Sequence, residues 1–279
     1  MTIKAIKRFI VSLTPPVITD WYRRRSIRNR KFGFMKEYKT WQEARAHATG
    51  YDSDIITEKV FKAALQVRNG TAVYERDSTI LTHIKHSWHL LASLLWVASR
   101  NENRLNLLDF GGSLGTSYFQ NRSFLGHLKE LRWNIVEQKK FFDYGKEYFE
   151  DEHLKFYPNI AEYARGNKPD AVLLSSSLQY IEKPYAVLEE IMRLQPKYVI
   201  FDKIPFLASS NEDHMVVQKV SPSIYDASYP CWVFGIDKFM SFFRKQNYRL
   251  VEQINHDQRE WFTVRGKIVD WSGYLFEKI

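Results

Sequence analysis

The chain has 279 residues, of which 44% are apolar and 26% charged, so it is too apolar to be disordered throughout and long enough for one large or two small domains. Its single cysteine, Cys231, excludes an intramolecular disulfide and a cysteine-based zinc site, and is typical of a reducing cytosol. The net charge of +9 would suit a nucleic-acid-binding protein if it were spread over the whole chain.

The positive charge is concentrated at the N-terminus. Residues 1–31 contain nine Lys and Arg residues and one acid, Asp20. The rest of the chain therefore has 32 of the 41 basic and 31 of the 32 acidic side chains. A nearly neutral body argues against a basic nucleic-acid-binding face.

The N-terminal segment, residues 1–31, begins with a predicted amphipathic helix that Pro15 and Pro16 end. Its apolar run is too short to span a bilayer, and it lacks the small-residue cleavage site of a secretory signal. With the basic cluster from Arg23 to Lys31, the segment is expected to bind the anionic inner face of the cytoplasmic membrane. Packing on the body and a nucleic-acid-binding arm are the alternatives.

Residues 32–100 are predicted to form a helical cap without a clear strand. A capping box begins a short helix at Thr40, and further helices are predicted over 54–67 and 79–99. Three histidines in the last of these recur every third residue: His83, His86 and His89. No metal site is expected, because this spacing drifts around a helix and no carboxylate cluster lies nearby.

Residues 101–279 alternate between strand and helix patterns, which predicts an α/β domain with a parallel sheet and helices on both faces. Strands are expected over residues 105–110, 133–137, 154–157, 171–175 and 197–202. Helices are expected over residues 115–129, 139–149, 159–165 and 183–194. A long aromatic segment then runs to residue 232, followed by a helix over 236–246 and late strands near 248–255 and 271–277.

The strongest local motif lies where the first of these strands meets its helix. The apolar strand reaches Asp109 and runs into the sequence Gly111-Gly112-Ser113-Leu114-Gly115. At the carboxyl end of a parallel strand, such a turn lines a ligand site, because glycines allow close approach and the N–H groups that open a helix attract polar groups. No Gly-Lys-Ser/Thr follows, which excludes a P-loop, and Ser113 and Thr116 break the G-x-G-x-x-G dinucleotide pattern.

The remaining pattern, Asp-x-Gly-x-Ser-x-Gly from Asp109 to Gly115, resembles the first motif of class I S-adenosylmethionine-dependent methyltransferases. Glu137 ends the next strand, where a carboxylate accepts hydrogen bonds from both hydroxyls of a ribose. Alone, it would equally suit a solvated strand end. The resemblance implies that the following residues hold S-adenosylmethionine: Asp109, Gly111, Gly112, Ser113, Gly115, Glu137, Ser175 and Ser176.

Longer sequence blocks extend the resemblance over essentially the whole chain. They include residues 50–52, 74–78, 87–88, 108–115, 133–138, 175–180, 222–225 and 227–232. Together they are similar to a family of methyltransferases encoded among bacterial surface-polysaccharide and lipopolysaccharide assembly genes. The resemblance implies a Rossmann-like, mostly parallel sheet with a late antiparallel strand and an N-terminal helical extension. It also implies methyl transfer (EC 2.1.1) to an oxygen of a sugar or sugar-linked group in a glycan or glycolipid.

Methyl transfer needs an acceptor oxygen in line with the methyl group and a group that takes the hydroxyl proton. Asp202, at the carboxyl end of the fifth strand, is the first candidate for a base or an orienting group, and His214 is the second. A turn cap and a surface histidine are the alternatives for these two residues. No nucleic-acid partner is expected.

The predicted substrate contacts are Gln179, Tyr180, Tyr225, Tyr229 and Trp232. Gln179 is a poor base, because an amide can position a hydroxyl but cannot take its proton. The aromatic faces suit a pyranose ring, although a packed aromatic cluster would have the same composition. Arg76 and Asp77 are candidates either to close over the cofactor or to form a structural ion pair.

Two other functions compete with a glycan methyltransferase at the cytoplasmic face of the membrane. A non-catalytic membrane-associated scaffold with the same fold would explain the lack of an unmistakable base. An RNA methyltransferase would explain the basic N-terminal segment, and would bind RNA with a steep salt dependence.

Overall fold

The structure is a computed structural model that describes residues 32–50, 54–76, 78–84, 86–221, 224, 227–255 and 262–279. The N-terminal segment and its predicted membrane contact lie outside the described residues, and so do Asp77 and Tyr225. Within the described part of the chain, no helix is long and apolar enough to cross a membrane.

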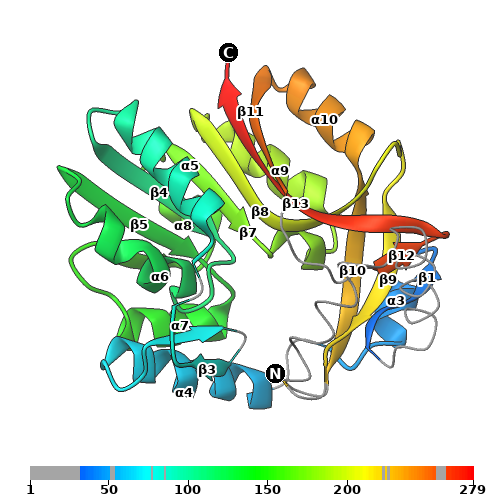
Figure 1. The fold of residues 1–279 in the computed structure, drawn as a ribbon, viewed down its shortest axis with the longest axis horizontal. Helices are drawn as coiled ribbons and strands as arrows, with labels where there is room; N and C mark the ends of the chain where they lie inside the picture. The colour runs from blue at the N-terminus through cyan, green and yellow to red at the C-terminus, as the bar shows by residue number, and fades with distance from the viewer. Residues whose placement is uncertain are drawn as a thin grey trace, which may run out of the picture.

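Five parallel strands form the centre of the molecule (Figure 1). They are β4 (Arg104–Phe110), β5 (Glu130–Val136), β6 (Leu154–Tyr157), β7 (Ala171–Ser175) and β8 (Tyr198–Leu207), in the spatial order β6-β5-β4-β7-β8. Strand β13 (Lys267–Lys278) is antiparallel to β8, and β11 (Tyr248–Asn255) is antiparallel to β13. This is the class I methyltransferase sheet, so the predicted fold class is confirmed.

Helices cover both faces of this sheet because its strands are apolar on both sides. On β4, Leu107 belongs to one hydrophobic cluster and the adjacent Leu108 to the other. Helices α5 (Trp88–Ser99), α6 (Thr116–Leu125) and α7 (Lys139–Tyr148) pack in the first cluster. Helices α8 (Ile160–Ala164), α9 (Pro184–Arg193) and α10 (Ile236–Lys245) pack in the second.

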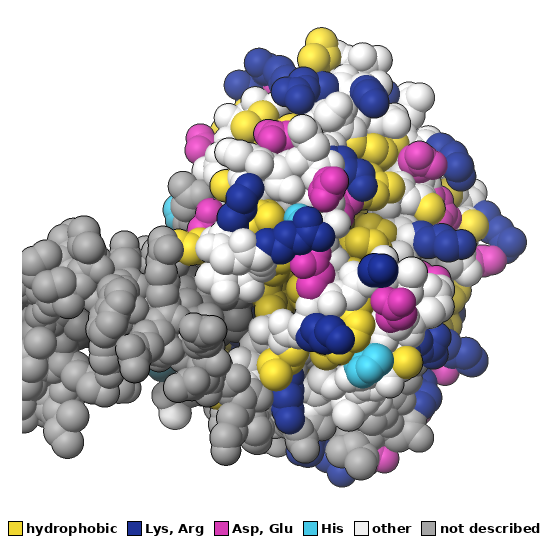
Figure 2. Space-filling model, turned by 90° about the vertical axis from the view of Figure 1, so that its right-hand side faces the viewer, with side chains coloured by type: hydrophobic (Ala, Val, Ile, Leu, Met, Phe, Trp, Pro, Cys, Tyr) yellow, Lys and Arg dark blue, Asp and Glu magenta, His cyan; other side chains and the backbone are white. Residues whose placement is uncertain are grey.

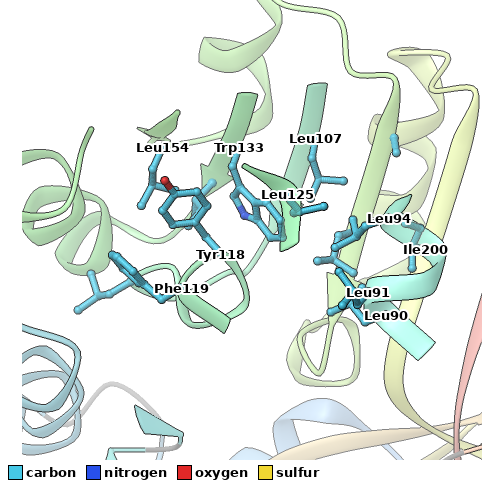
Figure 3. Close-up of a cluster of buried hydrophobic side chains, with 14 of the residues drawn as sticks. Leu90, Leu91, Leu94, Leu107, Tyr118, Phe119, Leu125, Trp133, Leu154 and Ile200 are labelled. Carbon is cyan, nitrogen blue, oxygen red and sulfur yellow. The ribbon is translucent and has the colours of Figure 1, made fainter. Parts of the chain in front are cut away.

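Trp133 of β5 lies at the centre of the first cluster and has no exposed surface. Its indole faces Tyr118 of α6 edge to face, with ring centroids 5.8 Å apart, and Leu107 and Leu125 lie on its other side (Figure 3). Burying a large apolar side chain contributes about 1.5–3 kcal/mol or more, in proportion to the apolar area removed from water. The tryptophan therefore ties α6, which begins at the glycine turn, to the sheet.

The segment over residues 32–100 departs from the prediction. It contains β1 (Gly33–Tyr38), α3 (Trp41–Ala46), α4 (Asp54–Arg68), the β2–β3 hairpin (Tyr74–Arg76 and Thr79–Leu81) and α5. In Figure 1, β1 and α3 lie beside β9 and β10, whereas α4 and β3 lie below α6 and α7. The expectation of no strand is wrong: the three-residue β2 and β3 are too short to show an alternating pattern, and β1 pairs with β9, which is distant in sequence. The boundaries at residues 31 and 100 remain predictions.

The long segment after Asp202 is also more regular than expected. Strand β8 continues to Leu207, and β9 (His214–Lys219) and β10 (Ser228–Gly235) follow as an antiparallel pair. Strand β9 also pairs with β1, while β10 joins the end of β8 where Phe234 lies opposite Phe206. Together with α3, these strands form a lobe that faces the carboxyl ends of the central strands (Figure 1).

Replacing Gly145 of α7 by alanine is expected to destabilise the protein. A Cβ atom there would lie 2.3 Å from the Phe156 ring, so the helix would have to move away from β6. Overpacking of this kind costs about 1–3 kcal/mol, which exceeds the gain of at most about 1 kcal/mol from the higher helix propensity of alanine. Thermal and urea unfolding measure the difference. Gly166→Ala is the control, because a Cβ at Gly166 meets no atom within 4 Å; equal losses from both variants would contradict the packing argument.

Candidate functional site

A cavity of ≈ 780 Å³ lies at the carboxyl ends of the parallel strands. One end is lined by the turn between β4 and α6, by Glu137 and by Ser175–Ser177. The other end is lined by Trp41 and Arg45 of α3, Tyr180–Glu182, Tyr229 and Pro230, and Lys203 lies between the two ends, next to Ser175 through their shared partner Asp202. Its volume is in the range of sites that hold a cofactor-sized ligand.

The glycine turn follows an unusual backbone path. Gly111, Ser113 and Gly115 all have left-handed conformations, with φ of 73°, 53° and 92°. A Cβ on Gly111 would lie 2.5 Å from the Cβ of Ser177, and a Cβ on Gly112 would lie 2.6 Å from the Asp109 carboxylate. Glycines are therefore needed here both for the turn and for close packing on its neighbours. Gly111, Gly112 and Ser113 line the cavity, whereas Gly115 caps α6.

Glu137, which directly follows β5, lines the cavity next to this turn. Its Oε1 accepts a hydrogen bond from the Ser113 N–H at 3.1 Å, and its Oε2 accepts one from the Gln138 N–H at 2.8 Å. Although the residue keeps some surface in the cavity, desolvation raises the pKa of its carboxyl to about 7. The carboxylate is thus fixed relative to the turn and offers acceptors to a ligand that carries hydroxyl groups.

Asp109 supports the turn and does not line the cavity. It is 1% exposed, and its Oδ2 accepts a hydrogen bond from the Trp133 indole N–H at 3.0 Å. Its Oδ1 has no hydrogen-bond partner among the described residues. Burial, with a smaller contribution from the nearby Glu137 and Asp202, raises the pKa of this carboxyl to about 7 against the opposing effect of the Trp133 bond. Asp109, predicted to contact the cofactor, therefore lies behind the turn and holds it in place.

Asp202 is likewise buried outside the cavity lining, with no exposed surface. Its Oδ2 accepts a hydrogen bond from the Ser175 hydroxyl at 2.8 Å and lies 2.9 Å from Lys203 Nζ. Its Oδ1 accepts a hydrogen bond from the Ser87 hydroxyl at 3.3 Å. The side chain predicted as a base therefore makes no surface of the cavity, while Ser175 and Lys203, which hold it, do.

His214 lies in the lobe formed by β1, β9 and β10, away from the cavity lining. Its Nδ1 is 2.8 Å from Glu37 Oε1, and Arg265 pairs with the other carboxylate oxygen at 3.0 Å. Only 5% of the histidine is exposed. The structure therefore places it in a structural ion-pair cluster, not at the predicted catalytic site.

The predicted substrate contacts divide into two groups. Tyr180 and Tyr229 line the cavity, where their rings meet edge to face at 4.9 Å. Gln179 is fully buried and donates to the Ser176 hydroxyl at 3.2 Å, so it supports the lining. Trp232 packs between α3 and α9, and its indole N–H donates to the Ile181 carbonyl at 3.0 Å. For Trp232 the packing alternative holds, and Gln179 does not line the cavity as a substrate contact would.

Several lining residues were not identified from the sequence: Trp41, Arg45, Glu75, Thr116, Glu182 and Lys203. Glu75 is 3% exposed and accepts a hydrogen bond from the Thr116 hydroxyl at the start of α6. Arg76, a candidate either to close over the cofactor or to form a structural ion pair, also lines the cavity. Of these residues, only Lys203 could have been identified from the sequence, because it directly follows Asp202, the end of the predicted strand.

Both the cavity lining and the surface contain basic and acidic side chains. Among the described residues that line the cavity, three are cationic (Arg45, Arg76 and Lys203) and four are acidic (Glu75, Glu137, Glu182 and Glu190). On the face seen in Figure 2, acidic side chains lie between the basic ones over the described residues. This distribution suits a small polar ligand better than a nucleic-acid backbone.

The chain is similar in fold to several solved methyltransferases. No protein-family model and no curated protein matches it. Magnesium protoporphyrin IX methyltransferase from Synechocystis PCC 6803, solved with SAH, is 10% identical with a TM-score of 0.43, over 68% of this chain and 82% of that one. The N-terminal domain of EvdMO1, solved with SAH and D-fucose, is 11% identical with a TM-score of 0.46, over 82% and 97%. An S-adenosylmethionine-dependent methyltransferase from Clostridium acetobutylicum ATCC 824 is 10% identical with a TM-score of 0.43, over 68% and 91%.

At these identities the likeness concerns the fold alone. The fold class therefore rests on the strand order and directions of this chain, with β13 inserted antiparallel between β8 and β11.

The variant Asp109→Asn is expected to flatten the pH dependence of stability. Because the folded-state pKa of Asp109 lies near 7, above that of an unfolded aspartate, the folded protein keeps a proton that the unfolded chain loses between pH 4 and 7. As the pH rises through this window, this group should lower the free energy of unfolding by up to about 1.4 kcal/mol per pH unit. The asparagine of the variant does not titrate, so the variant should lack this contribution. Urea unfolding at several pH values measures it. Asp143→Asn, at an exposed ion pair with Lys139, is the control; an unchanged slope in Asp109→Asn would refute the assignment.

Proposed function

We propose that this protein is an S-adenosylmethionine-dependent methyltransferase that methylates an oxygen of a sugar or sugar-linked group. The observation that carries the proposal is the pairing of the left-handed turn at Gly111–Ser113 with the Glu137 carboxylate, joined by the hydrogen bond from the Ser113 N–H. Both lie at the carboxyl edge of a parallel sheet, where ligands of such folds bind.

The residues present fit this cofactor. Glu137 offers carboxylate oxygens to the two ribose hydroxyls, while the turn and Arg76 line the part of the cavity suited to the polar amino-acid end. Because any side chain on Gly112 would meet Asp109, the turn leaves open backbone where a ligand must approach closely. When bound, S-adenosylmethionine supplies a methyl group on a positively charged sulfur.

The other end of the cavity suits the acceptor. Tyr180 and Tyr229 present aromatic surface there, and Gln42 of α3 donates to Glu182 at 2.9 Å, which joins the lobe to the loop after β7. The chain's contribution to the reaction is to orient the acceptor oxygen and limit water, since positioning accounts for much of the rate of such transfers. A surface polysaccharide or its lipid-linked precursor is the proposed acceptor, reached at the inner face of the cytoplasmic membrane through residues 1–31.

A non-catalytic scaffold is the second candidate. It is favoured by one observation: Asp202, His214 and Gln179 all lie outside the cavity lining. Cofactor binding without methyl transfer to any extracted glycolipid would support the scaffold over the enzyme.

Glu137→Ala is expected to weaken the binding of S-adenosylhomocysteine by about 10- to 100-fold, because hydrogen bonds to a charged group contribute about 1.5–3 kcal/mol. For the unmodified protein, affinity should fall as the pH drops below about 7, since protonation of Glu137 removes acceptor capacity. Glu137→Gln should lose most of this pH dependence. Isothermal titration calorimetry measures both effects, and Glu182→Gln, in the opposite end of the cavity, is the control. Equal affinities for Glu137→Ala and the unmodified protein would remove the cofactor assignment.

The acceptor class is tested in cells. Surface polysaccharide from cells that express the gene should contain sugars heavier by one methylene unit than those of cells that lack it, and mass spectrometry detects the difference. A catalytically weakened Glu137→Ala copy should restore little of the modification. Identical polysaccharides with and without the gene would exclude this acceptor.

A further inference from the structure

We propose that Lys203 forms an anion-binding subsite for the acceptor, so that the acceptor has a carboxylate or phosphate group near the oxygen that is methylated. The inference rests on the proposed function for the identity of the ligand. The subsite itself is defined by the residues around Lys203.

The first argument is the position of the lysine between a buried acid and the cavity. Nζ is 2.9 Å from Asp202 Oδ2, and 13% of the Lys203 side chain is exposed against 1% of the Asp202 side chain. Lys203 lines the cavity and Asp202 does not. A ligand in the cavity therefore meets the cation, while the compensating carboxylate is out of its reach.

The second argument is the backbone that presents this side chain. Lys203 has a left-handed conformation, with φ of 55°, and so does Ser176 on the neighbouring strand end, with φ of 54°. The Ser176 N–H donates to the Asp202 carbonyl at 2.8 Å, and the Gln179 amide donates to the Ser176 hydroxyl. Such conformations cost about 1–3 kcal/mol each and persist where the surroundings hold them, often at ligand sites. Here these hydrogen bonds hold the two strand segments together, and the pair with Asp202 holds the Lys203 ammonium at the cavity lining.

The third argument is the charge of the acceptor end. Arg45 of α3 lines the same cavity, so cations come from two different elements. Of the four acids that line the cavity, Glu182 accepts a hydrogen bond from Gln42, Glu75 accepts one from Thr116 and Glu137 accepts one from the Ser113 N–H; Glu190 is the fourth. Tyr180 and Tyr229 line the same cavity, which suits an acidic sugar: the rings can face the pyranose and the ammonium can bind its anionic group.

The test measures binding of simple sugars by calorimetry, with and without saturating S-adenosylhomocysteine. Methyl glucuronide and glucose 1-phosphate are the two anionic probes, and methyl glucoside is the neutral one. The unmodified protein should bind at least one anionic probe about tenfold more tightly than the neutral probe, the size expected for one hydrogen-bonded charge. The probe that binds more tightly identifies the anion as a carboxylate or a phosphate.

Lys203→Met should abolish most of this preference and leave the neutral probe and S-adenosylhomocysteine unaffected. Because that variant leaves Asp202 with one partner fewer, the double variant Asp202→Asn/Lys203→Met keeps the test valid if the single variant unfolds. Lys183→Met, an exposed lysine that is not among the lining residues, is the matched control.

Three results would overturn the subsite: no preference for either anion in the unmodified protein, no measurable binding of both anions, or a preference that survives in the variants that fold. Failure of the proposed function is distinguishable, because it would appear as absent S-adenosylhomocysteine binding in the unmodified protein whatever the sugars do.

Discussion

A carboxylate without exposed surface in the middle of β8, that of Asp202, organises the centre of this site. An ionised Asp202 that lacks water must be compensated by nearby donors, because an unpaired buried charge costs several kcal/mol. The donors come from three elements: Ser87 precedes α5, Ser175 ends β7 and Lys203 belongs to β8. Compensating one acid therefore fixes the ends of two adjacent strands and orients a hydroxyl and an ammonium toward the cavity.

The same arrangement recurs at the glycine turn. Asp109 is buried beneath the turn, bonded to the central Trp133, and leaves room above it for nothing larger than Gly112. Both aspartates are buried behind the cavity lining. Their neighbours, Gly112 beside Asp109 and Ser175 and Lys203 beside Asp202, form the surface that a ligand contacts. Asp109 and Asp202, which the sequence pattern selects as site residues, therefore hold the lining residues in place, whereas Glu137 is itself part of the lining.

Sequence patterns predicted the central sheet and several residues that line the cavity, for a physical reason. The strand–helix alternation is long and regular, and a glycine turn after a buried strand has few uses, so β4 to β8 and the residues Gly111–Ser113 and Glu137 could be located. The lobe could not be located, since the pairing of β1 with β9 joins residues that are distant in sequence. Whether Asp202 or Lys203 lines the cavity depends on a positive φ at a lysine, and no residue type signals that.

The two ends of the cavity are built from different parts of the fold. The turn end is built from the parallel sheet and helix α6, together with Glu75 and Arg76 of β2. The proposed acceptor end is built where the extended β8 and β10 meet α3, so its shape depends on the lobe. Because Lys203 is the point at which β8 leaves the common sheet and enters that lobe, a change there alters the acceptor site while the cofactor end stays intact. Selectivity for the acceptor can therefore change in this fold without loss of the turn and carboxylate that define the other half.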